Sequence, residues 1–375
     1  MKAYYFTEMP YPYYPSEVAE ELNSQRVILP NSYCDPVVAS DLYNRYLDEY
    51  EYAADLGMDL MLNEHHQTVT CMESVMPLTA STLARRTKDS KIVLLGSPLA
   101  HRDNPVRVAE ELAFLDCVSK GRIISGFVRG VPTECHPANT NPALTRERFE
   151  ESHDLILKAW TTHEPFNWEG RFWHYRYVNP WPRPYQQPHP PIWIPGASPD
   201  NIRWMADHQY VHANFLQSYE DQEAQHQVYR DRCDELGFPQ PGSDRFAFLC
   251  LIYVGETDAK AREEGRALMW YLEAVRHSGF WNPPGYNSPQ LSARIHMSGG
   301  LQRELGDWDE LNEKGIAIWG SPDTVIKKIK YLHERCQVGH LLMMMQAGFM
   351  QTETTRKSLK LFAEEVYPAI RELGE

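Results

Sequence analysis

Apolar runs rich in β-branched and aromatic residues alternate along this chain with stretches in which apolar residues recur at helical spacing. The apolar runs predict eight strands, at 3–7, 59–63, 91–96, 122–127, 191–195, 210–213, 246–254 and 340–345. The stretches between them predict helices at 41–56, 76–86, 106–119, 146–160, 199–207, 219–236, 259–276 and 322–335. An eightfold alternation in 375 residues favours a single (β/α)₈ TIM barrel, with a doubly wound sheet as the alternative.

Two insertions interrupt the alternation, near 161–190 and 279–314, and both are long enough to shape a site. In the first, Glu169-Gly170 between aromatic arms predicts a hairpin that packs on the barrel, and a proline-rich ligand for an SH3-type partner is the alternative. The second carries Pro283-Pro284-Gly285 and Ser298-Gly299-Gly300 as turn signals and predicts a mobile lid over the mouth. No linker is evident, so residues 1–375 are expected to form one domain.

Composition excludes several classes of function. Hydrophobic residues make up 42% of the chain, yet no apolar run reaches the roughly 18 residues that a membrane span needs. Seven scattered cysteines without a C-x-x-C pair, and a start that enters a strand pattern directly, indicate a cytoplasmic protein with reduced thiols. A formal net charge of -14 argues against nucleic acid as a partner.

The residues that follow the second predicted strand, Asn63-Glu64-His65-His66, are the strongest candidates for chemistry. Successive side chains on a strand point to opposite faces, so one histidine is expected to work and the other to support it. Polar capping of the strand is the alternative. A metal-dependent hydrolase using His65, His66, His101 and a carboxylate is a further alternative. Such sites usually require a His-x-His pair on a strand, so that both ligands face inward, and adjacent histidines do not meet this requirement, so no metal is predicted.

Three other loops carry candidate binding residues. Gly96-Ser97 would let a flat ligand approach the backbone, and an ordinary turn is the alternative. Arg129, between two glycines after the fourth strand, could bind a phosphate or carboxylate bidentately, or could pair with a carboxylate of the barrel. Ser198 and Asn201 lie at the start of a predicted helix, where free N–H groups bind anions, and plain N-capping by Ser198 is the alternative.

Several motifs, in order and over nearly the whole chain, resemble bacterial luciferase and its flavin-dependent monooxygenase relatives. These motifs are Glu64-His65-His66, the stretch from Asn104 to Arg122, Gly126-Phe127-Val128-Arg129-Gly130, Pro190-Pro191-Ile192-Trp193-Ile194, Gly320-Ser321-Pro322, and the stretch from Ser358 to Val366. The resemblance implies a (β/α)₈ barrel that holds reduced FMN at the carboxyl ends of its strands and reacts with O₂ through a C4a-peroxyflavin. It also implies a homodimer or larger homo-oligomer.

The resemblance assigns roles residue by residue. The required first histidine of the family corresponds to His65, with Glu64 and His66 beside it, and the phosphate-binding arginine corresponds to Arg129. The serine and threonine at the helix start correspond to Ser198 and to Asn201, which is a departure. Three further departures separate the chain from luciferase itself: Ala197 replaces a glutamate, Gly96-Ser97 replaces a cis pair of alanines, and Val128 replaces the cysteine beside the flavin.

The resemblance therefore implies an FMN-dependent monooxygenase, and the abundance of aromatic residues in 161–190 hints at a small apolar or aromatic substrate. The chain has no G-x-G-x-x-G after any strand, so reduced FMN is expected from a separate NAD(P)H:flavin reductase. Two alternatives keep the fold: an F420-dependent oxidoreductase and a non-catalytic flavin-binding protein.

Overall fold

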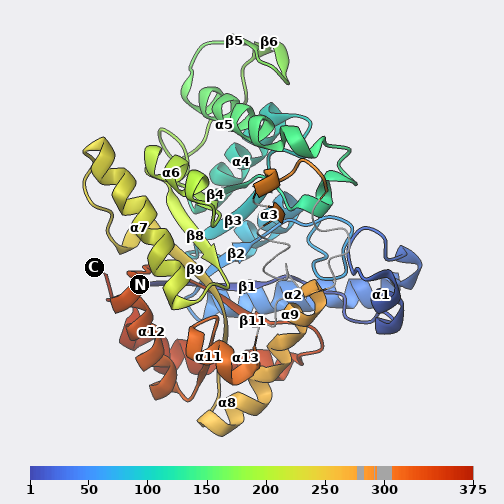
Figure 1. The fold of residues 1–375 in the computed structure, drawn as a ribbon, viewed down its shortest axis with the longest axis vertical. Helices are drawn as coiled ribbons and strands as arrows, with labels where there is room; N and C mark the ends of the chain where they lie inside the picture. The colour runs from blue at the N-terminus through green and yellow to red at the C-terminus, as the bar shows by residue number, and fades with distance from the viewer. Residues whose placement is uncertain (277–282, 291, 294–305, 375) are drawn as a thin grey trace.

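A barrel of parallel strands forms the centre of the computed structural model, which describes residues 1–276, 283–290, 292–293 and 306–374 (Figure 1). The sheet has the strand order β10-β9-β11-β1-β2-β3-β4-β7-β8, and a further pairing of β8 with β9 closes eight strands into the barrel. Its strands are β1 Lys2–Thr7, β2 Asp59–Leu62, β3 Ile92–Pro98, β4 Ile123–Val128, β7 Ile192–Pro195, β8 Val211–Phe215, β9 Phe246–Val254, β10 Ala317–Gly320 and β11 His340–Gln346. The predicted fold class and all eight predicted strands are confirmed.

The ninth strand, β10, was not predicted from the sequence. β9 is nine residues long, and one of its edges has room for two short partners: Phe246 to Leu249 pair with β8, and Leu251 to Val254 pair with β10. A four-residue strand that follows a long insertion has too short an apolar pattern to stand out in the sequence.

Helices cover the outside of the barrel (Figure 1). The α-helices are α1 Ser16–Leu22, α2 Pro36–Asp55, α3 Met76–Arg86, α4 Pro105–Ser119, α5 Thr145–Thr161, α6 Pro199–Asp207, α7 Tyr219–Leu236, α8 Asp258–Gly265, α9 Met269–Arg276, α11 Trp308–Lys314, α12 Pro322–Cys336, α13 Thr352–Leu361 and α14 Tyr367–Ile370. Shorter turns of helix are η1 Asn31–Tyr33, η2 Pro132–Cys135, η3 Pro142–Leu144, η4 Ser243–Arg245, η5 Arg266–Leu268 and η7 Phe362–Val366. Within the described residues, no helix is both long and apolar enough to cross a membrane.

Alternation along each strand divides the buried side chains into two layers. Tyr4, Phe6 and Met61 belong to the cluster inside the barrel, whereas Tyr5 and Leu60 pack outward against the helices. Both layers are needed because a parallel sheet is covered on both faces, which explains why its strands read as continuous apolar runs. The carboxyl ends of the strands remain open to ligands and form the mouth.

The first insertion forms the predicted hairpin, from β5 (Phe166–Glu169) and β6 (His174–Val178), which pair antiparallel. Its turn is tied to α5, because the Glu151 carboxylate accepts hydrogen bonds from the backbone amides of Arg171, Phe172 and Trp173. Figure 1 shows the hairpin on the outer side of α5, beyond the ring of helices. The hairpin is confirmed, and it packs on α5 rather than directly on the strands of the barrel.

The second insertion differs in part from the predicted lid. Its residues 279–282, 291 and 294–305 lie outside the described part of the chain. Residues 308–314 form α11, whose Trp308 stacks on Trp319 with ring centroids 6.0 Å apart and whose Leu311 is fully buried. The prediction of a lid as far as residue 314 was therefore wrong at its C-terminal end, because an apolar helix face packs there into the core.

Candidate active site

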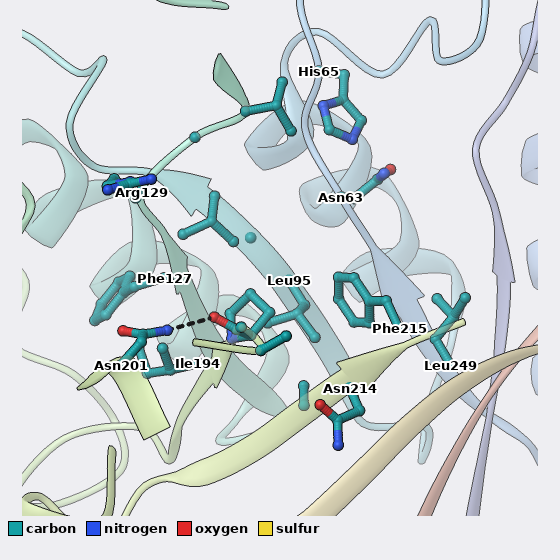
Figure 2. Close-up of a pocket in the computed structure, with 18 of the residues that line it drawn as sticks. Asn63, His65, Leu95, Phe127, Arg129, Ile194, Asn201, Asn214, Phe215 and Leu249 are labelled. Atoms are coloured by element: carbon teal, nitrogen blue, oxygen red, sulfur yellow. Dashed lines mark hydrogen bonds between the residues drawn. The ribbon is translucent and has the colours of Figure 1, made fainter. Parts of the chain in front are cut away.

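A cavity of about 860 Å³ lies at the carboxyl ends of the strands (Figure 2). We call one side the arginine end, which is lined by Arg129, Arg146, Ser198, Asn201 and Tyr286. The other side is the histidine end, lined by Phe6, Glu8, Met61, Asn63, His65, Glu134, Phe215, Leu249, Tyr271 and Met344. Figure 2 shows Arg129 and His65 on opposite sides of the space between the strands. The volume falls in the range of pockets that hold cofactors and small molecules.

Two carboxylates bracket the His65 ring. Its Nδ1 lies 2.9 Å from Oε1 of Glu134, on η2 just after β4, and its Nε2 lies 4.0 Å from Oε2 of Glu8, just after β1. Both glutamates are buried, at 2% and 5% exposure. Because Glu134 engages Nδ1, the Nε2 atom is the one directed toward Glu8 and the cavity. A ring held in this way can exchange a proton at one defined nitrogen.

Glu134 is ionised. Burial by itself would raise the pKa of this carboxyl, but the nearby His65 ring and its hydrogen bond outweigh burial. With Arg26 and the backbone amide of His66, they lower the pKa of Glu134 to about 2. The same carboxylate also accepts from the backbone N–H of Val131, so it ties the loop after β4 to the loop after β2.

Glu64 and His66 contact each other, and of these two residues only Glu64 lines the cavity. Glu64 caps α3 by accepting a hydrogen bond from the backbone N–H of Met76, and its other oxygen lies 3.5 Å from Arg102. His66 Nε2 lies 3.3 Å from Glu64, and the hydrogen bond to Glu64 is the main cause that raises the pKa of His66. Of the two histidines, His65 lines the cavity and His66 does not.

Apolar side chains form the rest of the histidine end. Phe6, Met61, Phe215, Leu249 and Met344 come from five different strands or strand ends and line the cavity together. Asn63 donates from Nδ2 to Glu8 over 2.8 Å, and Tyr271 hydrogen-bonds to the same carboxylate.

Arg129 follows β4 and is stacked on an aromatic ring. Its Cζ lies 3.7 Å from the ring centroid of Tyr286, whose hydroxyl donates to the carbonyl oxygen of Gly130 over 2.5 Å. Among the residues that the structure describes, Arg129 forms no ion pair with a carboxylate. The alternative that Arg129 locks the barrel through such a pair therefore finds no support there, and its N–H edges can meet an anion.

Ser198 and Asn201 lie at the start of α6, on the cavity. Ser198 caps the helix by accepting from the backbone N–H of Asn201 at 3.4 Å. The Asn201 amide donates to the carbonyl of Pro195 and accepts from Nη1 of Arg146, over 3.0 and 2.9 Å. Ser198 thus has its hydroxyl hydrogen available to an anion, whereas the Asn201 side chain already fixes the loop and a second guanidinium.

Gly96 lines the cavity, but a flat ligand is not what requires a glycine there. A Cβ on Gly96 would lie only 2.7 Å from the carbonyl oxygen of Gly126 on the neighbouring strand. Ser97 pairs with Phe127 in the sheet and does not line the cavity. A cis peptide before a non-proline residue occurs at Leu95-Gly96, one residue before the pair that corresponds to the alanines of luciferase. Val128 lines the cavity close to Gly96.

The sequence-based expectations for the first insertion change at the site. No residue of 161–190 lines the cavity, so the first insertion does not shape it and its aromatic residues say nothing about the substrate. That prediction was wrong because the hairpin packs against α5 instead. Within the described residues, no group of three or more histidine, cysteine or acidic side chains could hold a metal.

Sequence reasoning missed several cavity residues. Glu8 and Glu134 follow strands, and a charged residue just after a strand was a usable signal for both. Arg146, Tyr271 and Tyr286 lie on helices or in the second insertion, and only tertiary packing brings them to the cavity.

The sequence model of the luciferase-like monooxygenases matches residues 27–336. The chain belongs to this family. The family resemblance and the enzyme class expected from the motifs, a monooxygenase, are both confirmed.

Relatives of the chain span nearly its whole length. It is 24% identical to 2,5-diketocamphane 1,2-monooxygenase 2 of Pseudomonas putida over 84% of this chain and 89% of that protein. A solved structure of the oxygenating constituent of 3,6-diketocamphane monooxygenase from P. putida, in complex with FMN, matches with a TM-score of 0.74 and 20% identity over 98% of each chain. An F420-dependent secondary alcohol dehydrogenase matches with a TM-score of 0.68 and 15% identity, over 99% of this chain and 100% of that one.

Proposed function

We propose that this protein is an FMN-dependent monooxygenase that uses reduced FMN and O₂ to oxygenate a small, largely apolar organic substrate. The observation that carries the proposal is one cavity with unlike ends. An arginine and a helix N-terminus at one end suit the FMN phosphate, and an oriented histidine with apolar walls at the other suits its ring.

In this proposal the arginine end binds the phosphate. The Arg129 guanidinium offers two parallel N–H groups, and the Ser198 hydroxyl and the free amides of α6 add further donors. Asn201 contributes by holding Arg146 and the Pro195 loop in place. Gly96 lines the cavity and would present backbone rather than side chain to the ring.

The histidine end serves the reaction. Bound reduced FMN supplies the electrons that activate O₂. His65 holds or moves a proton at Nε2, and Glu134 fixes the ring through Nδ1. Glu64 and His66 are supporting residues, because Glu64 contacts His66 and accepts a hydrogen bond from the first turn of α3. The apolar side chains from the strands exclude water from the site, and the exclusion of water suppresses unproductive side reactions.

The proposed substrate is a small molecule with a mostly apolar skeleton and a polar group. The skeleton would rest on Phe6, Met61, Leu249 and Met344, with the polar group toward the rim at Asn63 and His65. This assignment rests on strand residues that line the cavity and replaces the one drawn from the hairpin aromatics.

We further propose that a separate NAD(P)H:flavin reductase supplies the reduced FMN. The chain has no G-x-G-x-x-G after a strand, and one similar structure is described as the oxygenating constituent of its monooxygenase. Assembly into a homodimer or larger homo-oligomer, a single domain over 1–375 and a location in the cytoplasm stay predictions.

Isotope incorporation tests the proposed function. The protein, FMN and an unrelated NADH:flavin reductase are incubated under ¹⁸O₂ with a panel of cyclic ketones and aldehydes. We expect one ¹⁸O atom per product molecule and less H₂O₂ than in the absence of substrate. Tight FMN binding with no labelled product across the panel would favour a non-catalytic flavin-binding protein.

An F420-dependent oxidoreductase is the second candidate, because a dehydrogenase of that kind shares the fold over the full length of this chain. The same protein is therefore mixed with F420 and a panel of alcohols. Reduction of F420 with no ¹⁸O incorporation in the first assay would replace the proposed function with this one.

A further inference from the structure

The described part of the second insertion reaches into the arginine end of the cavity. Residues 283–290 lie far from Arg129 in the sequence, yet the turn at Pro283-Pro284-Gly285 sends the Tyr286 ring onto the Arg129 guanidinium. The backbone N–H of Tyr286 bonds to the carbonyl of Pro283 over 3.2 Å, and Gly285 has φ +91. A Cβ added at Gly285 would lie 3.1 Å from that of Ala143, so the turn rests against η3.

Tyr286 makes two contacts with consecutive residues of the loop after β4. Its ring lies under the Arg129 guanidinium, and its hydroxyl donates to the carbonyl of Gly130. Burial raises the pKa of Tyr286 above its ordinary value of 10.0, so the hydroxyl is a donor at neutral pH. Two contacts define both the position of the ring and the plane of the guanidinium that stacks on it.

We infer that Tyr286 is a positioning residue for the cofactor phosphate, which it orders by holding Arg129; this inference rests on the proposed function. A guanidinium stacked on a ring keeps its N–H edges free for bidentate binding of a phosphate. Stacking also fixes several rotatable bonds of the arginine before the ligand arrives, which lowers the entropic cost of binding. An aromatic partner, unlike a carboxylate, leaves the positive charge available to the ligand.

The contribution is selective for a ligand with a phosphate. Riboflavin has the same ring system as FMN and no phosphate, so it serves as the reference ligand. Loss of the stacked ring should weaken FMN binding by about two- to thirtyfold, the range of cation–π contacts from exposed to desolvated sites. Riboflavin affinity should change by less than about twofold, because a contact beside the phosphate has little influence on the distant contacts of the ring system.

Titration of four variants with FMN and riboflavin, followed by flavin fluorescence, tests the inference. Tyr286→Leu removes the ring, and Tyr286→Phe keeps the ring while removing the hydroxyl bond to Gly130. Arg129→Ala removes the guanidinium, and the double variant Arg129→Ala/Tyr286→Leu completes a cycle. We expect Tyr286→Leu to lose affinity for FMN but not for riboflavin, and Tyr286→Phe to keep an FMN affinity closer to that of the parent protein. In the Arg129→Ala background, Tyr286→Leu should reduce FMN affinity little further. Circular dichroism of each variant verifies the fold.

The possible failures are distinguishable. If Arg129→Ala reduces FMN and riboflavin affinity equally, the phosphate placement in the proposed function is wrong, and the inference about Tyr286 is lost with it. If Arg129→Ala is selective for FMN but Tyr286→Leu is not, the proposed function stands and the inference is overturned. The inference would also be overturned if Tyr286→Leu reduced FMN affinity by the same factor in the parent protein and in Arg129→Ala, because the ring would then act independently of the arginine.

Discussion

Arg129 and His65, at opposite ends of the cavity, are held in different ways. At the arginine end, Arg129 rests on the neutral ring of Tyr286. At the histidine end, His65 lies between the carboxylates of Glu134 and Glu8. A neutral partner leaves the charge of a guanidinium for a ligand, whereas a carboxylate partner that binds one ring nitrogen of an imidazole fixes the ring. Under the proposed function, we therefore expect one end to bind an anion and the other to control a proton.

The largest effect is expected from substitution of His65, which should reduce product formation while leaving FMN binding nearly unchanged. His65→Asn should lower product formed per reduced flavin by roughly a hundredfold, the low end of what a positioned acid or base contributes. The reduced flavin should then yield H₂O₂ instead. FMN affinity should change little, because the side chain lies at the opposite end from Arg129. Product and H₂O₂ are measured together in single-turnover reactions under air.

His66→Ala is the matched control for this variant. His66 neighbours His65 in the sequence, but it faces Glu64 and does not line the cavity, so we expect only a few-fold loss of product. If His66 were the sensitive position and His65 the tolerant one, the roles of the two histidines would have to be exchanged.

Arg129→Ala should have the next largest effect, at the other end. Loss of a charge-assisted contact costs roughly 1.5–3 kcal/mol, or about ten- to a hundredfold in FMN affinity. Riboflavin affinity should hardly change. At saturating FMN, product per reduced flavin should recover to nearly that of the parent protein. If Arg129→Ala bound FMN normally but formed little product, the assignment of phosphate binding to one end and of the reaction to the other would be wrong.

Local patterns in the sequence were enough to locate the barrel and one key residue at each end. The eight strands that close the barrel are apolar runs that were recognisable without tertiary context, and His65 and Arg129 both follow such strands. Because the carboxyl ends of parallel strands meet at one mouth, the order of the strands placed these two residues on the same cavity.

Residues that reach the site through packing could not be located in this way. Tyr286 lies 157 positions after Arg129, and no local pattern links them. The aromatic hairpin was misread for the same reason. Residues such as Trp168 and Phe172 have the composition of a pocket wall, and only their contacts with α5 show that they cover the outside of the barrel.

Glu134→Gln should have a smaller effect, which depends on pH. The pKa of Glu134 is lowered from its ordinary value of 4.5 to about 2 in the folded protein, so its charge stabilises the fold above about pH 4.5. That contribution declines as the pH falls through 4.5 and is lost near pH 2. The variant should be less stable than the parent protein by about 1–2 kcal/mol at pH 7, because a charge-assisted hydrogen bond becomes a neutral one.

Urea unfolding of both proteins between pH 7 and pH 3 measures this difference. It should be constant from pH 7 to about pH 5 and should shrink below pH 4.5. A difference that is unchanged at pH 3 would show that Glu134 acts through its shape and hydrogen bonds and not through its charge. The histidine end would then resemble the arginine end more closely than the geometry indicates.

The smallest effect is expected at the aromatic hairpin, which belongs to neither end. Tyr177 is 82% exposed and Trp181 is 81% exposed, and no residue of 161–190 lines the cavity. The double variant Tyr177→Ser/Trp181→Ser should change the free energy of unfolding by no more than about 0.5 kcal/mol per site. FMN affinity, product per reduced flavin and the order of preference among ketones should stay those of the parent protein. A shift in that order of preference would mean that the hairpin contributes to substrate selection, and the contrast between the two ends would no longer account for the site.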